Sequence, residues 1–375
     1  MIGFDAKRAF CNATGLGNYS RMVIAGLAEM HPEIGIQLYT PYRKDAYRSC
    51  FDAFQNVKVV EPSCPLGRGS LWRSYGVSKA IRHDGLELFH GLSHELPHGL
   101  PAGLPALVTM HDMAAWRFPQ FFPRFDRMVY RQKQRYACEH ADVIIAVSEQ
   151  TKKDVMGFLE VSEKKIVVVG QSCDPQFWKP VSQEAVEQAR KKYGLPERYV
   201  ISVGTVEERK NQLTAVEAMA KVDQNISLVI VGRHQRYAEK AKASVEEFHM
   251  EHRVHFLEQA DFDDFPALYA GAICSLYLSV FEGFGIPVLE SMCSGTPVVC
   301  SNVSSLPEVA GDAAVLVDPT DVDAVAEAVN RVAEDAVFRN ELVGKAHIQS
   351  QRFSKEQVIG ELYEVYRNVL RSRQV

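Results

Sequence analysis

The chain has 375 residues, of which 46% are hydrophobic and 24% charged, and its formal net charge is -5. This length and composition predict two globular domains, each with a core of its own. The acidic balance argues against a general nucleic-acid binder, which would be basic. The eight cysteines are scattered and form no C-x-x-C pair, which indicates reduced thiols. No leader-like segment and no apolar run of transmembrane length are recognised, so a cytoplasmic protein is expected.

Short apolar runs alternate with amphipathic stretches along the chain, which is the pattern of βα units around a parallel sheet. The first half is predicted to hold strands at Ile2–Asp5, Gly35–Tyr39, Val57–Val60, Leu86–Phe89, Ala106–Met110, Val143–Val147 and Ile166–Val169. A polar stretch from Gln171 to about Glu184 is predicted to be a loop. A second series of strands is predicted at Arg198–Val203, Ser227–Val231, Val254–Leu257, Ile273–Leu278, Val298–Cys300 and Ala314–Val317. Helices are predicted between the strands, for example at Leu213–Val222, Glu239–His249 and Val322–Ala333, and a last helix at Lys355–Arg371.

These two series predict an α/β protein with two Rossmann-like domains, residues 1–175 and residues 176–354, that face a central cleft. Ligands of such sheets bind beyond the carboxyl ends of the strands. The candidate functional residues are therefore those in segments that directly follow a strand.

Residues 281–290, FEGFGIPVLE, carry two carboxylates eight positions apart, Glu282 and Glu290. Proline is tolerated at the start of a helix, so a helix is predicted to begin near Ile286 or Pro287, with Glu290 in its first turn. Helix starts bind anions through backbone N–H groups, here those of Gly283, Phe284, Gly285 and Ile286. Amide donors between two carboxylates suit a sugar nucleotide: the amides bind the diphosphate, one carboxylate the ribose and the other the transferred sugar.

A second candidate phosphate-binding element is the stretch 203–211, VGTVEERKN, which follows a strand and opens a helix. Gly204 and Thr205 form the turn, and Gly204 gives the backbone freedom there. Arg209 and Lys210 add two positive charges. Cations are slightly unfavourable at a helix start, so diphosphate binding is a reason for their presence; solvated first-turn charges are the alternative.

In the first half, residues 14–20, TGLGNYS, precede a helix predicted to begin near Tyr19. Gly15 and Gly17 would let the backbone approach a ligand, and a plain turn into the helix is the alternative. The spacing lacks the third glycine of a dinucleotide fingerprint. His111 follows a predicted strand at its carboxyl end, where a neutral imidazole can hydrogen-bond a sugar hydroxyl or serve the fold alone.

Taken together, these segments resemble the retaining glycosyltransferases of the GT-B fold, family 4. Residues 282–290 resemble the E-x7-E motif of that family, and residues 290–299, ESMCSGTPVV, its E-A-M-A-x-G-x-P-V-V pattern. Residues 204–211 resemble its G-x-x-x-x-R-K-N element. The loop 14–19 resembles T-G-I-G-R-Y, with Asn18 in place of the arginine, and His111 with Asp112 resembles the H-D pair. The resemblance is continuous from about Val200 to Pro319 and weaker in the first half.

The resemblance implies a retaining hexosyltransferase of polysaccharide or cell-surface glycan synthesis. Arg209 and Lys210 would bind the diphosphate, Glu290 the ribose, and Glu282 and His111 the sugar. The donor would be a GDP- or UDP-linked sugar, with mannose favoured, used by front-face substitution without a metal or other cofactor. The acceptor would be a glycan or a lipid-linked glycan. The last helix, within residues 355–375, would return to the first domain.

Alternatives with the same fold are a nucleotide-sugar epimerase and a glycogen-type synthase, and an alternative of another class is a non-catalytic nucleotide-sugar-binding subunit. An NAD oxidoreductase is disfavoured because its fingerprint is missing.

Three further features have simpler explanations. The D-x-D sequences at 261–263 and 321–323 precede helices, where aspartate is a normal N-cap, and so are not interpreted as metal motifs. The histidines at 90, 94 and 98 with Glu95 fit no zinc spacing and are assigned to a loop near the acceptor. The basic stretch Arg124–Arg135 is either a solvated helix face or a peripheral contact with an anionic membrane, which would suit a lipid-linked acceptor.

Overall fold

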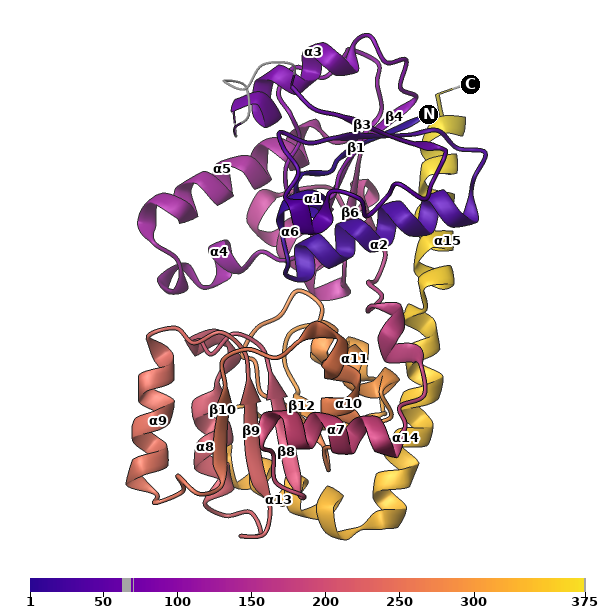
Figure 1. The fold of residues 1–375 in the computed structure, drawn as a ribbon. Coiled ribbons are helices and arrows are strands. Elements are labelled where there is room, and N and C mark those ends of the chain that lie inside the picture. Colours follow the sequence, from indigo (N-terminus) through magenta and orange to yellow (C-terminus); the bar gives the residue numbers. More distant parts are fainter. Residues whose placement is uncertain (63–68, 70, 374–375) are drawn as a thin grey trace. The chain divides into compact units, whose positions relative to one another are not determined.

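The computed structural model describes residues 1–62, 69 and 71–373 (Figure 1). The chain divides into two compact units, Met1–Ser172 with Ser354–Val375, and Cys173–Phe353. Each unit holds one sheet whose strands all pair in parallel, so the predicted α/β architecture is confirmed. Every predicted strand is present, with ends that agree within two residues.

The first unit has a seven-stranded sheet in the order β3-β2-β1-β4-β5-β6-β7. Its strands are β1 (Ile2–Asp5), β2 (Ile36–Tyr39), β3 (Val57–Val60), β4 (Leu88–Gly91), β5 (Ala106–Met110), β6 (Val143–Ala146) and β7 (Ile166–Val168). Its helices are α1 (Lys7–Cys11), α2 (Gly15–Met30), α3 (Val77–Ile81), α4 (Ala114–Arg117), α5 (Arg124–His140), α6 (Glu149–Leu159) and α15 (Lys355–Arg371). The inner strands β1, β2, β4 and β5 are buried throughout, as expected for a parallel sheet with helices on both faces.

The last helix, α15, packs on α2 of the first unit. The two helices approach closely at Gly26, where an added Cβ would lie 2.7 Å from Ile359 Cγ1. A buried polar chain reinforces this packing, because Tyr366 Oη lies 2.7 Å from His90 Nδ1 and His90 Nε2 lies 2.9 Å from Thr109 Oγ1. His90 is therefore a structural residue of β4 and does not belong to the loop to which the sequence pattern assigned it.

The second unit has a six-stranded sheet in the order β10-β9-β8-β11-β12-β13. Its strands are β8 (Tyr199–Val203), β9 (Ser227–Val231), β10 (Val254–Leu257), β11 (Ser275–Tyr277), β12 (Val298–Ser301) and β13 (Ala314–Val317). Its helices are α7 (Gln183–Tyr193), α8 (Gln212–Met219), α9 (Tyr237–Glu247), α10 (Phe265–Ala270), α11 (Ile286–Cys293), α12 (Leu306–Ala310), α13 (Val322–Glu334) and α14 (Ala336–Ser350). Helices α8, α9 and α13 pack side by side over one core, and α10 and α11 pack together beside β11 and β12.

Two predictions about where helices begin are wrong. Helix α2 begins at Gly15 and not near Tyr19, so the two glycines of that segment lie in the first turn of a helix. The predicted loop 171–184 contains a 3-10 helix, Pro175–Trp178, and the start of α7.

The two D-x-D sequences behave differently. Asp321 caps α13 by accepting a hydrogen bond from Ala324 N at 3.0 Å, as predicted. The side chain of Asp261 makes no such cap and pairs with Lys192 Nζ at 2.6 Å.

Most of the basic side chains of α5 bind their own unit. Arg127 and Arg131 donate to the carbonyl oxygens of Pro119 and Ala115, each at 3.1 Å, and Lys133 donates to Glu95 at 2.8 Å. Phe125 is 69% exposed and Met128 58%. Contact of this helix with a membrane stays a prediction. Within the described ranges, no helix is long and apolar enough to cross a bilayer.

The position of Gly17 in α2 generates a stability prediction. An added Cβ there would lie 1.9 Å from the backbone oxygen of Asn12, whereas nothing lies within 4 Å of a Cβ added at Gly15. Gly17→Ala should lower the free energy of unfolding by about 2 kcal/mol or more, because the backbone of Asn12 cannot withdraw cheaply. Gly15→Ala should change it by less than about 1 kcal/mol. Urea unfolding of both variants measures the difference, and equal effects would contradict this packing.

Candidate active site

The candidate site lies where the second sheet changes its direction of winding. Strands β8 and β11 are neighbours in the sheet. The strands that follow β8 in the chain, β9 and β10, lie on one side of this pair, and those that follow β11, β12 and β13, lie on the other. Loops that leave the carboxyl ends of such a strand pair diverge and leave a crevice for a ligand. The loop after β8 carries Arg209 and Lys210, and the loop after β11 carries Glu282. Val280 N donates to Arg209 O at 2.9 Å, so the two loops are joined through their backbones.

Glu282 is the centre of a buried cluster of charges. Its Oε1 lies 2.6 Å from Lys210 Nζ and 2.9 Å from Arg209 Nη1. Arg209 also donates to Phe281 O at 2.9 Å and to Glu207 Oε1 at 2.7 Å. The sequence placed these three ionic side chains at one ligand, and the structure brings them into direct contact.

The electrostatics of this cluster fix the charge of the carboxylate. Burial by itself raises the pKa of Glu282, but the positive charges of Arg209 and Lys210 outweigh it and lower this pKa to about 2. Burial lowers the pKa of Lys210, and Glu282 opposes this shift by stabilising the ammonium form. Glu282 is therefore a fixed negative charge at neutral pH and no proton donor.

Tyr277 belongs to the same cluster, although no sequence motif pointed to it. It is the last residue of β11 and only 3% exposed. Its hydroxyl donates to Glu282 Oε1 at 3.0 Å and accepts from Lys210 Nζ, which also lies 4.7 Å from the ring centroid. Burial raises the pKa of Tyr277 well above its usual value, so the phenol keeps its proton.

The predicted anion-binding turn leads into α11, which begins at Ile286 as expected. Gly285 has φ 122°, in the region that favours glycine, and an added Cβ would lie 2.7 Å from Leu306 Cδ2. The hydroxyl of Ser305 donates to the carbonyl oxygens of Glu282 and Phe284, at 3.0 and 2.6 Å. In the described part of the chain, the N–H groups of Phe284, Gly285 and Ile286 have no acceptor, as an anion site at a helix start requires.

Glu290 is the fifth residue of α11, one residue beyond the first turn in which it was predicted. Its Oε2 accepts from the hydroxyl of Tyr269, a fully buried residue of α10, at 3.2 Å. Burial raises the pKa of Glu290 to about 7, and the hydrogen bond from Tyr269 opposes this shift. The two carboxylates of one motif therefore differ: Glu282 is ionised, whereas Glu290 titrates near neutral pH.

The turn after β8 has the predicted form. Gly204 has φ 142°, and its N–H donates to Val231 O at 2.9 Å. The carbonyl oxygen of Thr205 accepts from Gln212 Nε2 at 3.1 Å. These bonds hold the loop that presents Arg209 and Lys210, and a phosphate contact from Gly204 or Thr205 stays a prediction.

In the first unit, His111 follows β5 and is buried against its own domain. Its Nε2 lies 2.9 Å from Leu92 O and its Nδ1 lies 3.2 Å from Gln171 Nε2. Burial lowers the pKa of His111 to about 3, so the ring is neutral: Nε2–H donates to Leu92 and Nδ1 accepts from Gln171. A sugar hydroxyl that donated to Nδ1 would replace Gln171, and the predicted sugar contact stays untested.

The two glycines of residues 14–20 differ in their surroundings. Gly17 is buried and is required by the approach of Asn12, whereas Gly15 is exposed at the open end of α2. A ligand contact from Gly15 or Gly17 stays a prediction.

No group of three or more His, Cys, Asp and Glu side chains suited to a metal occurs within residues 1–62, 69 and 71–373. Independence of metals stays a prediction.

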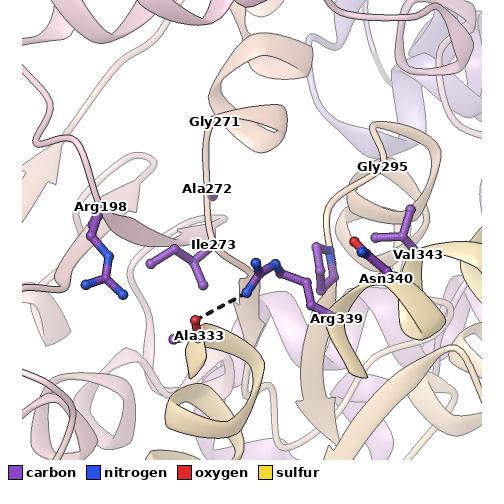
Figure 2. Close-up of a pocket in the computed structure, with 10 residues that line it drawn as sticks. Arg198, Gly271, Ala272, Ile273, Gly295, Ala333, Arg339, Asn340 and Val343 are labelled. Carbon is purple, nitrogen blue, oxygen red and sulfur yellow. Dashed lines mark hydrogen bonds between the residues drawn. The ribbon is translucent and has the colours of Figure 1, made fainter. Parts of the chain in front are cut away.

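A cavity of about 530 Å³ lies elsewhere in the second unit (Figure 2). Its lining includes Arg198 and Pro297, which directly precede strands, and Ile273, two residues before β11, so it lies at the amino edge of the sheet. Figure 2 shows Arg339 reaching Ala333, and it donates to the carbonyl oxygens that end α13. Arg198 pairs with Asp223 at 3.6 Å. Because both arginines already serve the fold, we do not assign this cavity to the ligand site.

Comparison with known proteins identifies the family. A family model described as Glycosyltransferase Family 4 matches residues 13–177, and one described as Glycosyl transferases group 1 matches residues 185–349. The O-antigen chain mannosyltransferase B of Escherichia coli is 30% identical over 268 residues, which cover 70% of this chain and 70% of that protein. The chain belongs to glycosyltransferase family 4.

Further relatives agree with this assignment. The serotype-specific mannosyltransferase WbdA of Escherichia coli is 28% identical over 245 residues, which cover 63% of this chain but only 30% of that longer protein. The crystal structure of Anabaena HepE in complex with UDP and glucose aligns with a TM-score of 0.75, 18% identity, and coverage of 98% of this chain and 99% of that one. This last likeness shows the GT-B fold. The predicted family and fold are both confirmed.

The pKa of Glu290 predicts how nucleotide binding by this glycosyltransferase depends on pH. Ribose hydroxyls donate to a carboxylate, so binding favours the ionised form, which is lost as the pH falls below about 7. The dissociation constant of a nucleotide sugar should rise about tenfold from pH 8 to pH 6. Isothermal titration at several pH values measures it. Glu290→Gln should bind more weakly and without this pH dependence, and a flat profile in the unaltered protein would contradict the role of Glu290.

Proposed function

We propose that this protein is a retaining glycosyltransferase that moves a hexose from a nucleotide-diphosphate sugar to a glycan or lipid-linked acceptor. The observation that carries the proposal is the contact of Glu282 with Arg209 and Lys210. It lies in the loops that follow the neighbouring strands β8 and β11, beside the start of α11. Mannose is the proposed sugar and GDP the proposed carrier. The names of the two Escherichia coli mannosyltransferases support the sugar, and synthesis of a cell-surface polysaccharide is the proposed setting.

Charge and geometry support diphosphate binding at this place. The side chains of Arg209 and Lys210 are 22% and 13% exposed, so each is mostly buried but keeps some contact with solvent. The amides of Phe284, Gly285 and Ile286 add uncharged donors at the end of α11 that carries the positive partial charge. In such a partly dry site, fixed cations and amides stabilise the charge that develops on a departing diphosphate.

The positions of the two carboxylates support the division of the donor between them. Glu282 stands between the cations, where it meets the sugar next to the bond that breaks. Glu290 lies on the helix behind the anion-binding turn, where it meets the ribose. These roles are the ones that the family motif implies for matching residues.

The reaction proposed is a front-face substitution. The bond from the anomeric carbon to the diphosphate oxygen breaks, the bond to the acceptor oxygen forms on the same face, and the departing diphosphate takes the acceptor proton. Glu282 is ionised, and Arg209, Lys210 and Tyr277 all contact its Oε1, which suits a sugar-binding group better than a covalent nucleophile. The diphosphate needs no metal in this scheme, since Arg209 and Lys210 supply the positive charge.

Product analysis tests the reaction class and the donor. GDP-mannose, UDP-glucose, UDP-galactose and UDP-N-acetylglucosamine are incubated with a panel of mannose-terminated acceptors, and released diphosphate and product mass are measured. We expect acceptor-dependent release from GDP-mannose and a product with the anomeric configuration of the donor, read by NMR. An inverted product would exclude the retaining reaction. Epimerised donor without transfer would favour the epimerase, and tight binding without turnover the binding subunit.

Variants of the second unit test the assignment of residues. Lys210→Ala should lower kcat about 100-fold to 1,000-fold, since one fixed charge is lost from the transition state. Glu290→Ala should instead weaken nucleotide binding about 10-fold to 100-fold, the cost of hydrogen bonds to a charged group. Lys221→Ala is the matched control, because Lys221 is 51% exposed and pairs with Asp323 on the surface. Unchanged turnover and binding in both site variants would contradict the proposed site.

A further inference from the structure

We propose that Tyr277 is a positioning residue of the transfer reaction: its hydroxyl fixes the orientation of Glu282 and Lys210 toward the donor. This inference rests on the proposed function and adds a residue that lies outside the motifs that identify the family.

The contacts of Tyr277 single it out. Its hydroxyl joins the two charged groups, because it donates to Glu282 Oε1 at 3.0 Å and accepts from Lys210 Nζ. Its ring supports the ammonium group, whose nitrogen lies 4.7 Å from the centroid. The backbone of Tyr277 belongs to β11, which pairs with β12 at this residue. Of Tyr277, Lys210 and Arg209, the tyrosine has the fewest rotatable bonds, and it alone stands on a β-strand.

The contacts of Glu282 indicate which of its two carboxylate oxygens faces the donor. Tyr277, Lys210 and Arg209 all approach its Oε1. Oε2 receives none of these three contacts, so we assign it the hydrogen bond from a hydroxyl of the sugar. Rotation of the carboxylate about its terminal bond would exchange the two oxygens, and the hydroxyl of Tyr277 opposes that rotation from a fixed point. Groups that are held this way before substrate binds lose less free energy in reaching the transition state.

A second tyrosine offers a comparison. Tyr269 donates to Glu290 as Tyr277 donates to Glu282, and it is fully buried. If each tyrosine acts through its own carboxylate, removal of the two hydroxyls should have different kinetic effects. Tyr277→Phe should change turnover, and Tyr269→Phe should change nucleotide affinity.

A third tyrosine supplies the structural control. Tyr199 is fully buried in β8 of the same unit, and its hydroxyl donates to the backbone oxygen Leu268 O at 2.7 Å and not to either carboxylate. Tyr199→Phe therefore removes a buried hydroxyl of comparable environment without touching the cluster. Its thermal midpoint gives the loss of stability that any buried tyrosine hydroxyl in this unit can cause.

The experiment measures kcat, donor KM and nucleoside diphosphate affinity for the three phenylalanine variants of the full chain. Tyr277→Phe should lower kcat about 10-fold to 100-fold while the affinity for the diphosphate changes less than about threefold, since the phosphate contacts remain. Tyr269→Phe should weaken diphosphate affinity and leave kcat at saturation within about threefold. Tyr199→Phe should change thermal stability alone.

A double-mutant cycle shows whether Tyr277 acts through Glu282. In the Glu282→Gln background, Tyr277→Phe should lower kcat by less than about threefold, because its target is already altered. A purely structural role predicts the same loss in both backgrounds, and that result would overturn the inference. So would an unchanged kcat in Tyr277→Phe alone. Failure of the proposed function has a different signature: Glu282→Gln and Lys210→Ala would themselves leave transfer unchanged.

Discussion

The buried contact of one carboxylate with two cations is the interaction on which the site depends. Arg209 and Lys210 keep Glu282 ionised in the loops that follow the neighbouring strands β8 and β11. Burial of three charges costs free energy that their mutual attraction only partly offsets, so such a cluster is poor as a stabilising device. The cluster is better explained by its ability to meet a charged ligand. Loops from two strands, joined by the bond from Val280 to Arg209, keep it in place.

The same chain segment carries a second carboxylate with the opposite behaviour. Glu282 faces fixed positive charges, whereas Glu290 faces a tyrosine hydroxyl in a buried environment that raises its pKa to about 7. One residue thus keeps its charge under all physiological conditions, and the other can change its protonation when a ligand arrives. Two buried tyrosines, Tyr277 and Tyr269, each donate a hydrogen bond to one of these carboxylates, so the two acids are supported separately.

Much of the fold could be predicted from the sequence, because buried parallel strands are short apolar runs bounded by polar residues. The start of α11 was predictable for a local reason as well, since a glycine turn followed by proline allows few alternatives. The start of α2 was not, because a glycine pair signals a loop and a helix turn alike. The close approach of Asn12 to Gly17, which explains that glycine, depends on how α1 packs against α2. Asp261 was likewise predicted to be a helix cap, but its side chain forms an ion pair with Lys192, which lies far from it in the sequence.

By itself, the sequence determined the alternating order of strands and helices, the family and the ionic residues of its motifs, since these are properties of neighbouring residues. The tertiary structure alone decided which of those residues touch. It placed Tyr277 between Lys210 and Glu282, although these residues lie 67 and 5 positions away along the chain. It also made His111 a buried, neutral ring and His90 a partner of Tyr366. Burial and partner charges set the pKa of each group, and both arise only when distant segments pack together.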